Sequence, residues 1–287
     1  MLSEPFLADL HMHSTASDGV LAPKALIQYA AKKGLCTVAL TDHDSMAGIA
    51  EALEAGKEYG VRVITGVELS AGDDGETHIL GLGDSVRPQE LNPLLKRMQL
   101  GRMTRARKIA DKLQGLGVDI DIDSLITQYE GRIGRPHIAR ELLRVGAVQT
   151  FQEAFDRYIG NGSPAYVQKE PLTATDAIHT LLRAHMVPVL AHPGLMHLDA
   201  PTLNALLDTW QQEGLRGMEA YHYANRQERG CEFYERLARS RGLLVTGGSD
   251  FHCDGDSHAG LGEMAPLWTQ AESDVAALTQ SMHQFED

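Results

Sequence analysis

The sequence has few cysteines and no long apolar run. Its 287 residues include three cysteines, Cys36, Cys231 and Cys253, which are widely spaced and odd in number. Such a set argues against a disulfide framework and favours a reducing compartment. No apolar run approaches the ~20 residues that a membrane-spanning helix needs. The first ten residues also lack the basic start and the long apolar stretch of a signal peptide. We therefore expect a cytoplasmic protein that does not associate with membranes.

Positive charge is also scarce. Lys and Arg number 26 against 39 Asp and Glu, which gives a formal net charge of −13. The phosphates of a duplex would be repelled overall, so this balance argues against sequence-independent binding of duplex DNA. It still allows a small phosphorylated substrate that is held by a local cation. Hydrophobic residues at 43% and charged residues at 23% are typical of a globular enzyme.

Short apolar runs alternate with helical patterns along most of the chain. We expect strands at residues 6–10, 36–40, 61–69, 76–83, 187–190, 217–221 and 243–248. Short strands that alternate with helices indicate a parallel sheet with crossover helices. Seven such strands predict an α/β fold with a closed or nearly closed (β/α) barrel.

This alternation stops between about Arg87 and Pro164. The helical patterns there cover residues 92–117, 122–129, 135–146 and 150–160. We therefore expect the barrel to be built from residues 1–86 and 165–287, with an all-helical insertion over 87–164. The stretch 96–112 carries seven Lys or Arg residues but no aromatic residue on which a base could stack. It fits a solvated helix face better than an RNA-binding face, which stays an alternative.

Histidine and carboxylate side chains accompany nearly every predicted strand. His11 and His13 follow the first strand, His43 follows the second, Glu68 ends the third and His78 opens the fourth. In barrels of parallel strands, the active site forms at the carboxyl ends of the strands. The last three strands lead into His192, into Glu219 and His222, and into Asp250 and His252. As a set, these positions predict an active site rather than scattered structural histidines.

The residue types point to metal ions. On a strand, residues i and i+2 face the same side, so His11 and His13 aim two imidazoles at one point, with Asp18 a short loop away. Imidazole and carboxylate together favour zinc, manganese or iron over calcium. The set exceeds what one ion needs, and Glu68, central among the strand ends, is our candidate for a bridging carboxylate. Two close metal ions can deprotonate a shared water and stabilise an in-line displacement, which predicts hydrolysis of a phosphate ester.

The ordered motifs DLHMHS, SDG, TDHD, GVELS, AHP and GSDFH resemble those of the PHP (polymerase and histidinol phosphatase) family, over nearly the whole chain outside the insertion. The resemblance implies a distorted (β/α)7-like barrel with two or three divalent metal ions, Mn²⁺, Fe²⁺ or Zn²⁺. It also implies three sets of ligands: His11, His13, Glu68 and Asp250; Asp18, His43 and His252, with Glu68 bridging; and His78 with His192, which hold a third metal or contact phosphate.

Two segments of the insertion and its boundary, GRPHIAR (134–140) and PAYV (164–167), resemble the stand-alone, nucleotide-hydrolysing branch of this family. That branch implies a metal-dependent phosphomonoesterase that removes the 3′-phosphate of small nucleoside 3′,5′-bisphosphates. Close relatives imply a 5′-to-3′ exoribonuclease acting on short RNA as an alternative. Histidinol-phosphate phosphatase is a further alternative, and a non-catalytic, metal-stabilised scaffold is an alternative of a different class.

A second phosphate on the substrate needs cations or hydrogen-bond donors of its own. Arg135 and His137 open a predicted helix whose N-terminus favours anions, and arginine suits bidentate contacts with phosphate. The leaving 3′-oxygen needs a proton, for which His192 and His222 are candidates. The other candidates for substrate contact lie where the chain re-enters the barrel or just after residues 217–221: Lys169, Asn225 and Arg226.

Overall fold

The computed structural model describes residues 6–72, 77–168, 171–255 and 259–285. The chain forms two compact units, which we call the barrel unit (Met1–Asn92 with Pro171–Asp287) and the helical unit (Pro93–Glu170). The predicted insertion shares residues 93–164 with the helical unit. The boundaries are offset from the predicted ones because one continuous helix, α3 (Pro88–Gly115), begins in the barrel unit and continues in the helical unit.

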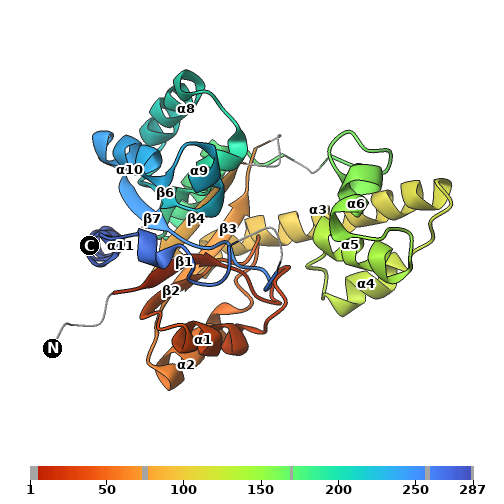
Figure 1. Cartoon of the computed structure of the whole chain (residues 1–287), viewed down its shortest axis with the longest axis horizontal. Coiled ribbons are helices and arrows are strands. Elements are labelled where there is room, and N and C mark those ends of the chain that lie inside the picture. The colour runs from red at the N-terminus through yellow and green to blue at the C-terminus, as the bar shows by residue number, and fades with distance from the viewer. Residues whose placement is uncertain (1–5, 73–76, 169–170, 256–258, 286–287) are drawn as a thin grey trace. The chain divides into compact units, whose positions relative to one another are not determined.

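Seven strands form the centre of the barrel unit (Figure 1). They are β1 (Ala8–Met12), β2 (Thr37–Leu40), β3 (Arg62–Ser70), β4 (His78–Gly83), β5 (Val187–Leu190), β6 (Gly217–Tyr221) and β7 (Leu244–Gly247), and their order in the sheet is their order in the chain. Just after β7, Phe251 forms a bridge with Met12. The backbone N–H of His13 also donates to the carbonyl of Phe251 over 2.9 Å. The sheet therefore nearly closes, which confirms the predicted (β/α)7-like barrel.

The direction of the fourth strand differs from the prediction. Four strand pairs are parallel, but β4 is antiparallel to both β3 and β5. The expectation of a wholly parallel sheet is therefore wrong at β4. Only residues 71–77 separate β3 from β4, and a parallel crossover needs a dozen or more residues. The reversal brings the start of β4, where His78 lies, to the edge at which the other strands end.

Helices flank this sheet, with α1 and α2 on one side of the barrel unit and α8 and α10 on another (Figure 1). Pro23 is the first residue of α1, where its missing N–H costs no helical hydrogen bond. Leu26 and Ile27 of α1 are fully buried in a cluster that includes Val38 and Leu40 of β2. The helices of this unit are α1 (Pro23–Lys32), α2 (Ile49–Tyr59), α7 (Ala174–Arg183), η2 (Pro193–Met196), α8 (Ala200–Gln212), α9 (Tyr223–Glu228), α10 (Cys231–Ser240), η3 (Ala265–Leu267) and α11 (Ala271–His283).

The helical unit has an apolar core of its own. Its core includes Ile109 and Leu113 of α3 and Leu142 of α5, all fully or nearly fully buried. The four predicted helical segments are confirmed as α3, α4 (Ile122–Gln128), α5 (Arg135–Arg144) and α6 (Phe151–Ala154) with the π-helical turn η1 (Phe155–Ile159). Among the described residues, no helix is both long enough and apolar enough to cross a membrane.

Candidate metal centre

All nine side chains predicted as metal ligands lie together in the barrel unit. Their ligand atoms form overlapping groups, and within each group the atoms are at most 4.8 Å apart. His192 joins the cluster through Glu68, whose Oε1 lies 3.0 Å from its Nε2. The groups are His11, His13, Glu68 and Asp250; His13, Asp18, His43 and His252; and His43, Glu68 and His78.

Glu68 lies at the centre of the cluster and is fully buried. Its Oε2 is 3.3 Å from Nε2 of His11, 3.3 Å from Nε2 of His13 and 2.9 Å from Nδ1 of His43. Its Oε1 is 2.7 Å from Nδ1 of His78 and 3.0 Å from Nε2 of His192. Each oxygen thus faces a different set of histidines, which is the arrangement needed for a carboxylate that bridges two cations.

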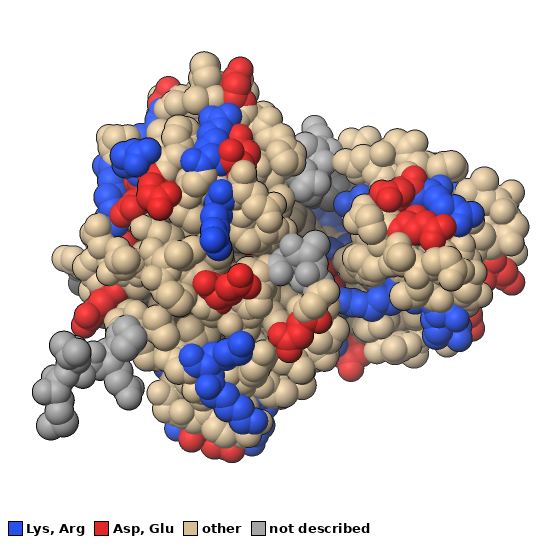
Figure 2. Space-filling model, in the orientation of Figure 1, with Lys and Arg blue, Asp and Glu red and all other residues tan. Residues whose placement is uncertain are grey.

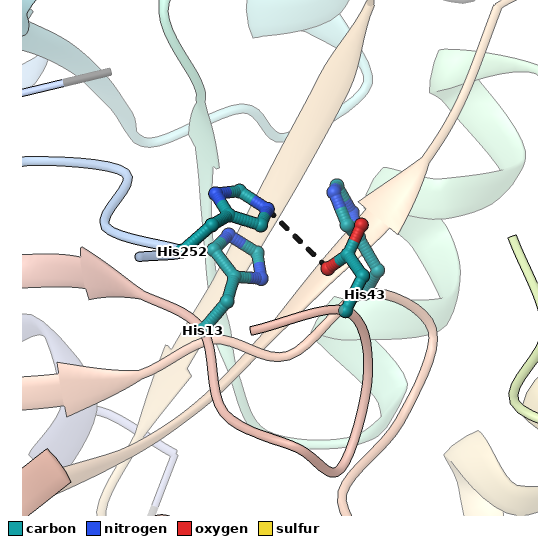
Figure 3. Close-up of side chains that lie close together, drawn as sticks. His13, His43 and His252 are labelled. Carbon is teal, nitrogen blue, oxygen red and sulfur yellow. Dashed lines mark ion pairs between the residues drawn. The ribbon is translucent and has the colours of Figure 1, made fainter. Parts of the chain in front are cut away.

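The second group differs from the set that the resemblance implied. His13, His43 and His252 are close together (Figure 3), and the rings of His13 and His252 stack with their centroids 4.2 Å apart. Nε2 of His252 lies 3.3 Å from Oδ1 of Asp18. The second group shares His13 with the first group. Glu68 is not a member of the second group, but it contacts that group through His43. Glu68 is itself a member of the first and third groups.

The donor atoms fit divalent cations. Among the described residues, Nε2 of His11, Nε2 of His13 and Oε2 of Glu68 are buried without a hydrogen-bond partner, although they face one another. A buried polar atom without a partner is costly in a protein that binds nothing at that point. Imidazole nitrogens and carboxylate oxygens that converge in this way suit Zn²⁺, Mn²⁺ or Fe²⁺. The residues therefore fit the metal ions that the sequence predicts.

The charges of the cluster depend on one another. Burial would raise the pKa of the Glu68 carboxyl, but the surrounding histidines hold that pKa well below its usual range. Burial opposes protonation of His11, yet the carboxylates of Glu68, Glu219 and Asp250 raise its pKa well above the usual value. Burial lowers the pKa of His78 to about 4. Without metal, the centre therefore keeps its carboxylates ionised and holds protons that a cation would displace.

Two of the predicted ligands are held in unusual backbone conformations. Asp250 has a φ of 54° and His192 a φ of 27°, a region that residues other than glycine seldom occupy. The N–H of Asp250 donates to the carbonyl of His11 over 2.8 Å. A Cβ on Gly248 would lie 2.4 Å from Cβ of His11, so glycine is needed for this close approach. Backbone strain of this kind persists where the surrounding structure enforces it, often at active sites.

A buried carboxylate fixes the loop that carries Asp18. Asp42 accepts hydrogen bonds from the backbone N–H and the hydroxyl of Ser14 and from the hydroxyl of Ser17, each over 2.7 Å. These contacts tie the 13–18 loop to the end of β2. Asp42 thus orients the second group of ligands without belonging to it.

Two further carboxylates are buried beside the cluster: Asp9, which was missed as a site residue, and Glu219, which was placed at the site without a role. Asp9 accepts the backbone N–H of Ser249 over 2.9 Å, and Glu219 accepts the backbone N–H of His192 over 2.8 Å. Both residues interrupt strands whose other members are buried. An acidic residue inside such a strand is rare unless it has a partner, and this was the available signal.

Two predicted site residues of the barrel unit, His222 and Asn225, are held by buried hydrogen bonds. His222 is fully buried, its Nδ1 accepts the N–H of Ala224 over 3.2 Å at the start of α9, and its Nε2 lies 3.6 Å from Oδ2 of Asp250. Asn225 is also fully buried. Its amide donates to the carbonyl of Glu219 over 2.8 Å, and its Oδ1 accepts the N–H of Gly194 over 2.7 Å. His222 therefore lies beside the ligand cluster, and Asn225 holds the backbone just after His192.

The remaining predicted contacts lie in different surroundings. His137 is buried, and its Nδ1 accepts the N–H of Gly134 over 2.9 Å, so it caps the N-terminus of α5. Its ring packs on Tyr129 with the centroids 3.9 Å apart. Arg226 is exposed in the last turn of α9. Lys169 lies outside the described residues.

Arg135 belongs to a cluster of cations within the helical unit. The guanidinium carbons of Arg105 and Arg135 lie 5.7 and 5.8 Å from the ring centre of Tyr166. Nε of Arg105 donates to the carbonyl of Val167 over 2.6 Å. Burial, with Arg135 and Arg102 nearby, lowers the pKa of Arg105 to about 10. This part of the helical unit therefore carries concentrated positive charge, although the chain as a whole is acidic.

Comparison with known proteins identifies the family. The model of the PHP domain matches residues 9–183. The chain is 36% identical over 245 residues to a 5′-3′ exoribonuclease of Haemophilus influenzae. The aligned region covers 85% of this chain and 89% of that protein. It is 32% identical over 277 residues to a 3′,5′-nucleoside bisphosphate phosphatase of Chromobacterium violaceum. The aligned region covers 93% of this chain and 97% of that protein.

The same relationship holds at the level of structure. A structure from Bifidobacterium adolescentis that is assigned as a metal-dependent phosphoesterase superposes with a TM-score of 0.83 at 30% identity, over 96% of both chains. This likeness covers the barrel that carries the ligand cluster and the helical unit inserted into its chain. The chain belongs to the PHP family, and it is a metal-dependent phosphoesterase of that family.

Proposed function

We propose that this phosphoesterase removes the 3′-phosphate of nucleoside 3′,5′-bisphosphates, converting adenosine 3′,5′-bisphosphate to 5′-AMP and phosphate. The observation that carries the proposal is the overlap of the ligand groups at Glu68. Cations held this close together suit displacement at phosphorus, where attacking and leaving oxygens both need charge stabilisation. Similarity over 93% of the chain to a relative named for this substrate supports the same choice.

We propose that all nine clustered side chains hold two or three ions of Mn²⁺, Fe²⁺ or Zn²⁺. When bound, these ions would supply positive charge to the phosphoryl oxygens and acidify a water molecule. His192 directs Nε2 at Glu68, so we propose that it acts as a ligand through this atom rather than as the proton donor. Asp42 keeps the loop of Asp18 in place while the substrate binds and leaves.

For the retained 5′-phosphate we propose Arg135 as the contact. Arg135 begins α5, and it lies with Arg105 around Tyr166. A helix N-terminus and a guanidinium both favour a phosphate dianion. An enzyme that uses such a contact would prefer a bisphosphate over a nucleoside 3′-monophosphate. The exposed Arg226 is the second candidate.

A second candidate function is 5′-to-3′ shortening of RNA. The observation that favours it is the 36% identity to the exoribonuclease of Haemophilus influenzae. On the face shown in Figure 2, the described Lys and Arg residues of the barrel unit are interspersed with Asp and Glu. A polymer substrate would gain little from such a mixed surface, so we rank the mononucleotide first. Family membership argues against a non-catalytic scaffold, and a cytoplasmic location stays a prediction.

The test compares three substrates on one manganese-loaded preparation. Phosphate release is measured from adenosine 3′,5′-bisphosphate and from histidinol phosphate, and shortening is measured on a 5′-phosphorylated RNA oligomer. The nucleotide product is identified as 5′-AMP or 3′-AMP. We expect rapid formation of 5′-AMP and slow reaction of the other two. Faster shortening of RNA would overturn the proposal in favour of the exoribonuclease, and 3′-AMP as product would show that the other phosphate is cleaved.

Arg135→Ala tests the phosphate contact. We expect it to raise KM for the bisphosphate more than for adenosine 3′-monophosphate, which lacks the 5′-phosphate. Arg107→Ala is the matched control, because Arg107 lies in the same unit but pairs at the surface with Asp123 over 2.9 Å. An equal change of KM for both substrates would exclude Arg135 as the contact for the 5′-phosphate.

A further inference from the structure

A carboxylate beneath the ligand cluster contacts two of the ligands at once. Glu219 is fully buried in β6. Nδ1 of His11 lies 3.2 Å from its Oε1 and 3.3 Å from its Oε2. The backbone N–H of His192 donates to its Oε2 over 2.8 Å. Glu219 therefore links a residue of β1 to a residue that follows β5, across the interior of the barrel.

The contact with His11 determines which ring nitrogen can bind a cation. A ring nitrogen that faces an ionised carboxylate carries the proton, so Nδ1 of His11 is the N–H donor. A cation that displaced the second proton of His11 would then meet the lone pair of Nε2, which lies 3.3 Å from Oε2 of Glu68 and 3.4 Å from Oδ1 of Asp250. Carboxylate partners of this kind fix the tautomer and the ring orientation of histidine ligands.

The contact with His192 holds a strained backbone. His192 has φ 27° and ψ 57°, and such conformations persist only where the surrounding structure enforces them. The bond from its N–H to Glu219 restrains this turn, and Asn225 of α9 restrains the next residues through the N–H of Gly194. The position of the His192 ring, 3.0 Å from Glu68, follows from this restraint.

We propose that Glu219 is a positioning residue that aligns His11 and His192 for two different cations of the cluster. This inference rests on the proposed metal ligation and not on the proposed substrate. Glutamine has the same size but is neutral, and its NH2 group takes the place of one acceptor oxygen, so Glu219→Gln sets a donor against the N–H of His11 or of His192. Aspartate keeps the charge but is shorter by one methylene group, so Glu219→Asp reaches at most one of the two.

The experiment measures metal binding directly. Mn²⁺ affinity is determined by competition with a chelator for the wild type, Glu219→Gln and Glu219→Asp. The matched control is Asp274→Asn, which neutralises another buried carboxylate of the barrel unit. Asp274 contacts Nη2 of Arg239 over 2.9 Å and Nε1 of Trp268 over 2.8 Å, and it contacts none of the proposed ligands. Melting temperatures are recorded with and without Mn²⁺ for every variant.

We expect Glu219→Gln to weaken Mn²⁺ binding by about 10–100-fold, the usual cost of losing an outer partner of a histidine ligand. Glu219→Asp should lie between Glu219→Gln and the wild type. The rise in melting temperature that Mn²⁺ produces should shrink in both, since it depends on affinity. Asp274→Asn should lower the melting temperature equally with and without Mn²⁺ and leave the affinity unchanged.

Two results would count against these ideas, and they are distinct. Wild-type affinity in Glu219→Gln, with a folded protein, would overturn the positioning role. Absence of Mn²⁺, Zn²⁺ and Fe²⁺ binding in the wild type would overturn the proposed metal ligation itself. Nitrogen-15 spectra of histidine-labelled, Zn²⁺-loaded protein give a further check, because Nδ1 of His11 should be the protonated nitrogen in the wild type and its signal should shift in Glu219→Gln.

Discussion

The two units of this chain differ in how many charged or titratable side chains they bury. The barrel unit buries at least eight carboxylate or imidazole groups around one point, among them Asp9, His13, Glu68 and Glu219. Among the described residues of the helical unit, His137 and Glu141 are the buried charged or titratable side chains. His137 caps a helix, and Glu141 pairs with Arg144 at the unit's surface. The core of the helical unit is otherwise apolar.

This difference indicates that the barrel unit, rather than the core of the helical unit, is built to bind cations. Taking a charged group out of water costs several kcal/mol unless partners compensate it, so a fold gains nothing from doing so repeatedly. In the barrel unit the compensation is mutual, because carboxylates and histidines face each other at 2.7–3.4 Å. Such an arrangement stabilises a core less than apolar contacts would, but it presents several donor atoms to a cation. The helical unit is held by apolar contacts, and its charges stay available at the surface.

Neutralising one buried glutamate in each unit should give the largest difference between the two units. Glu68→Gln removes the carboxylate that faces five histidines, so we expect metal content and phosphatase activity to fall by more than the roughly 100-fold that an outer partner costs. Glu141→Gln removes a pair with Arg144, whose side chain is 71% exposed, so we expect little change in activity. Metal content and phosphate release measure both variants. An active, metal-replete Glu68→Gln would show that the cluster is structural.

A pH series on chelator-treated protein is expected to have the next largest effect. Partner carboxylates raise the pKa of His11, His13, His192 and His252 against the opposing effect of burial. A raised pKa stabilises the folded state below the unfolded value of about 6.5, and this stability is lost as pH rises through the folded pKa. We therefore expect the metal-free protein to lose stability from about pH 6.5 upwards, measured as urea midpoints.

The acid side of the same series has the opposite sign. The pKa of Glu68 is lowered in the folded protein, so its contribution is present above the unfolded carboxyl pKa and is lost as pH falls through the folded one. Saturating Mn²⁺ should abolish the loss on the alkaline side, because the cation replaces the protons. A urea midpoint that stays constant above pH 6.5 without metal would contradict the charge arrangement described for the cluster.

A buried histidine in each unit gives a smaller contrast. His137→Ala removes the cap of α5 and the packing on Tyr129. Loss of a cap costs about 1 kcal/mol, so we expect a lower urea midpoint with unchanged metal content. His78→Ala should instead reduce the number of bound ions, because Nδ1 of His78 faces Glu68. Unfolding curves and metal analysis are recorded for both variants. Loss of metal in His137→Ala, or full metal content in His78→Ala, would contradict these assignments.

The sequence predicted the barrel, the helical insertion and the residues of the cluster. The cluster was predictable because His, Asp and Glu recur at the ends of successive predicted strands. It did not predict the direction of β4. An apolar run such as residues 78–83 reads the same in either direction, and the short connection before it was the overlooked signal. The roles of Glu219 and Asn225 depend on partners 208 and 31 positions away, and no local pattern reports such contacts.

The smallest expected effects concern exposed ion pairs, where the two units should respond alike. Glu54→Gln breaks a pair with Lys57 in α2, in which both side chains are about three-quarters exposed. Arg107→Gln breaks the pair with Asp123 in the helical unit, in which the side chains are 49% and 74% exposed. Solvent screens such pairs, so each change should alter the free energy of unfolding by at most about 0.5 kcal/mol. Urea titrations at two salt concentrations check this. A larger, salt-sensitive loss in Arg107→Gln alone would mean that the helical unit depends on its surface charges for stability, and its apolar core would then be an incomplete account of how it folds.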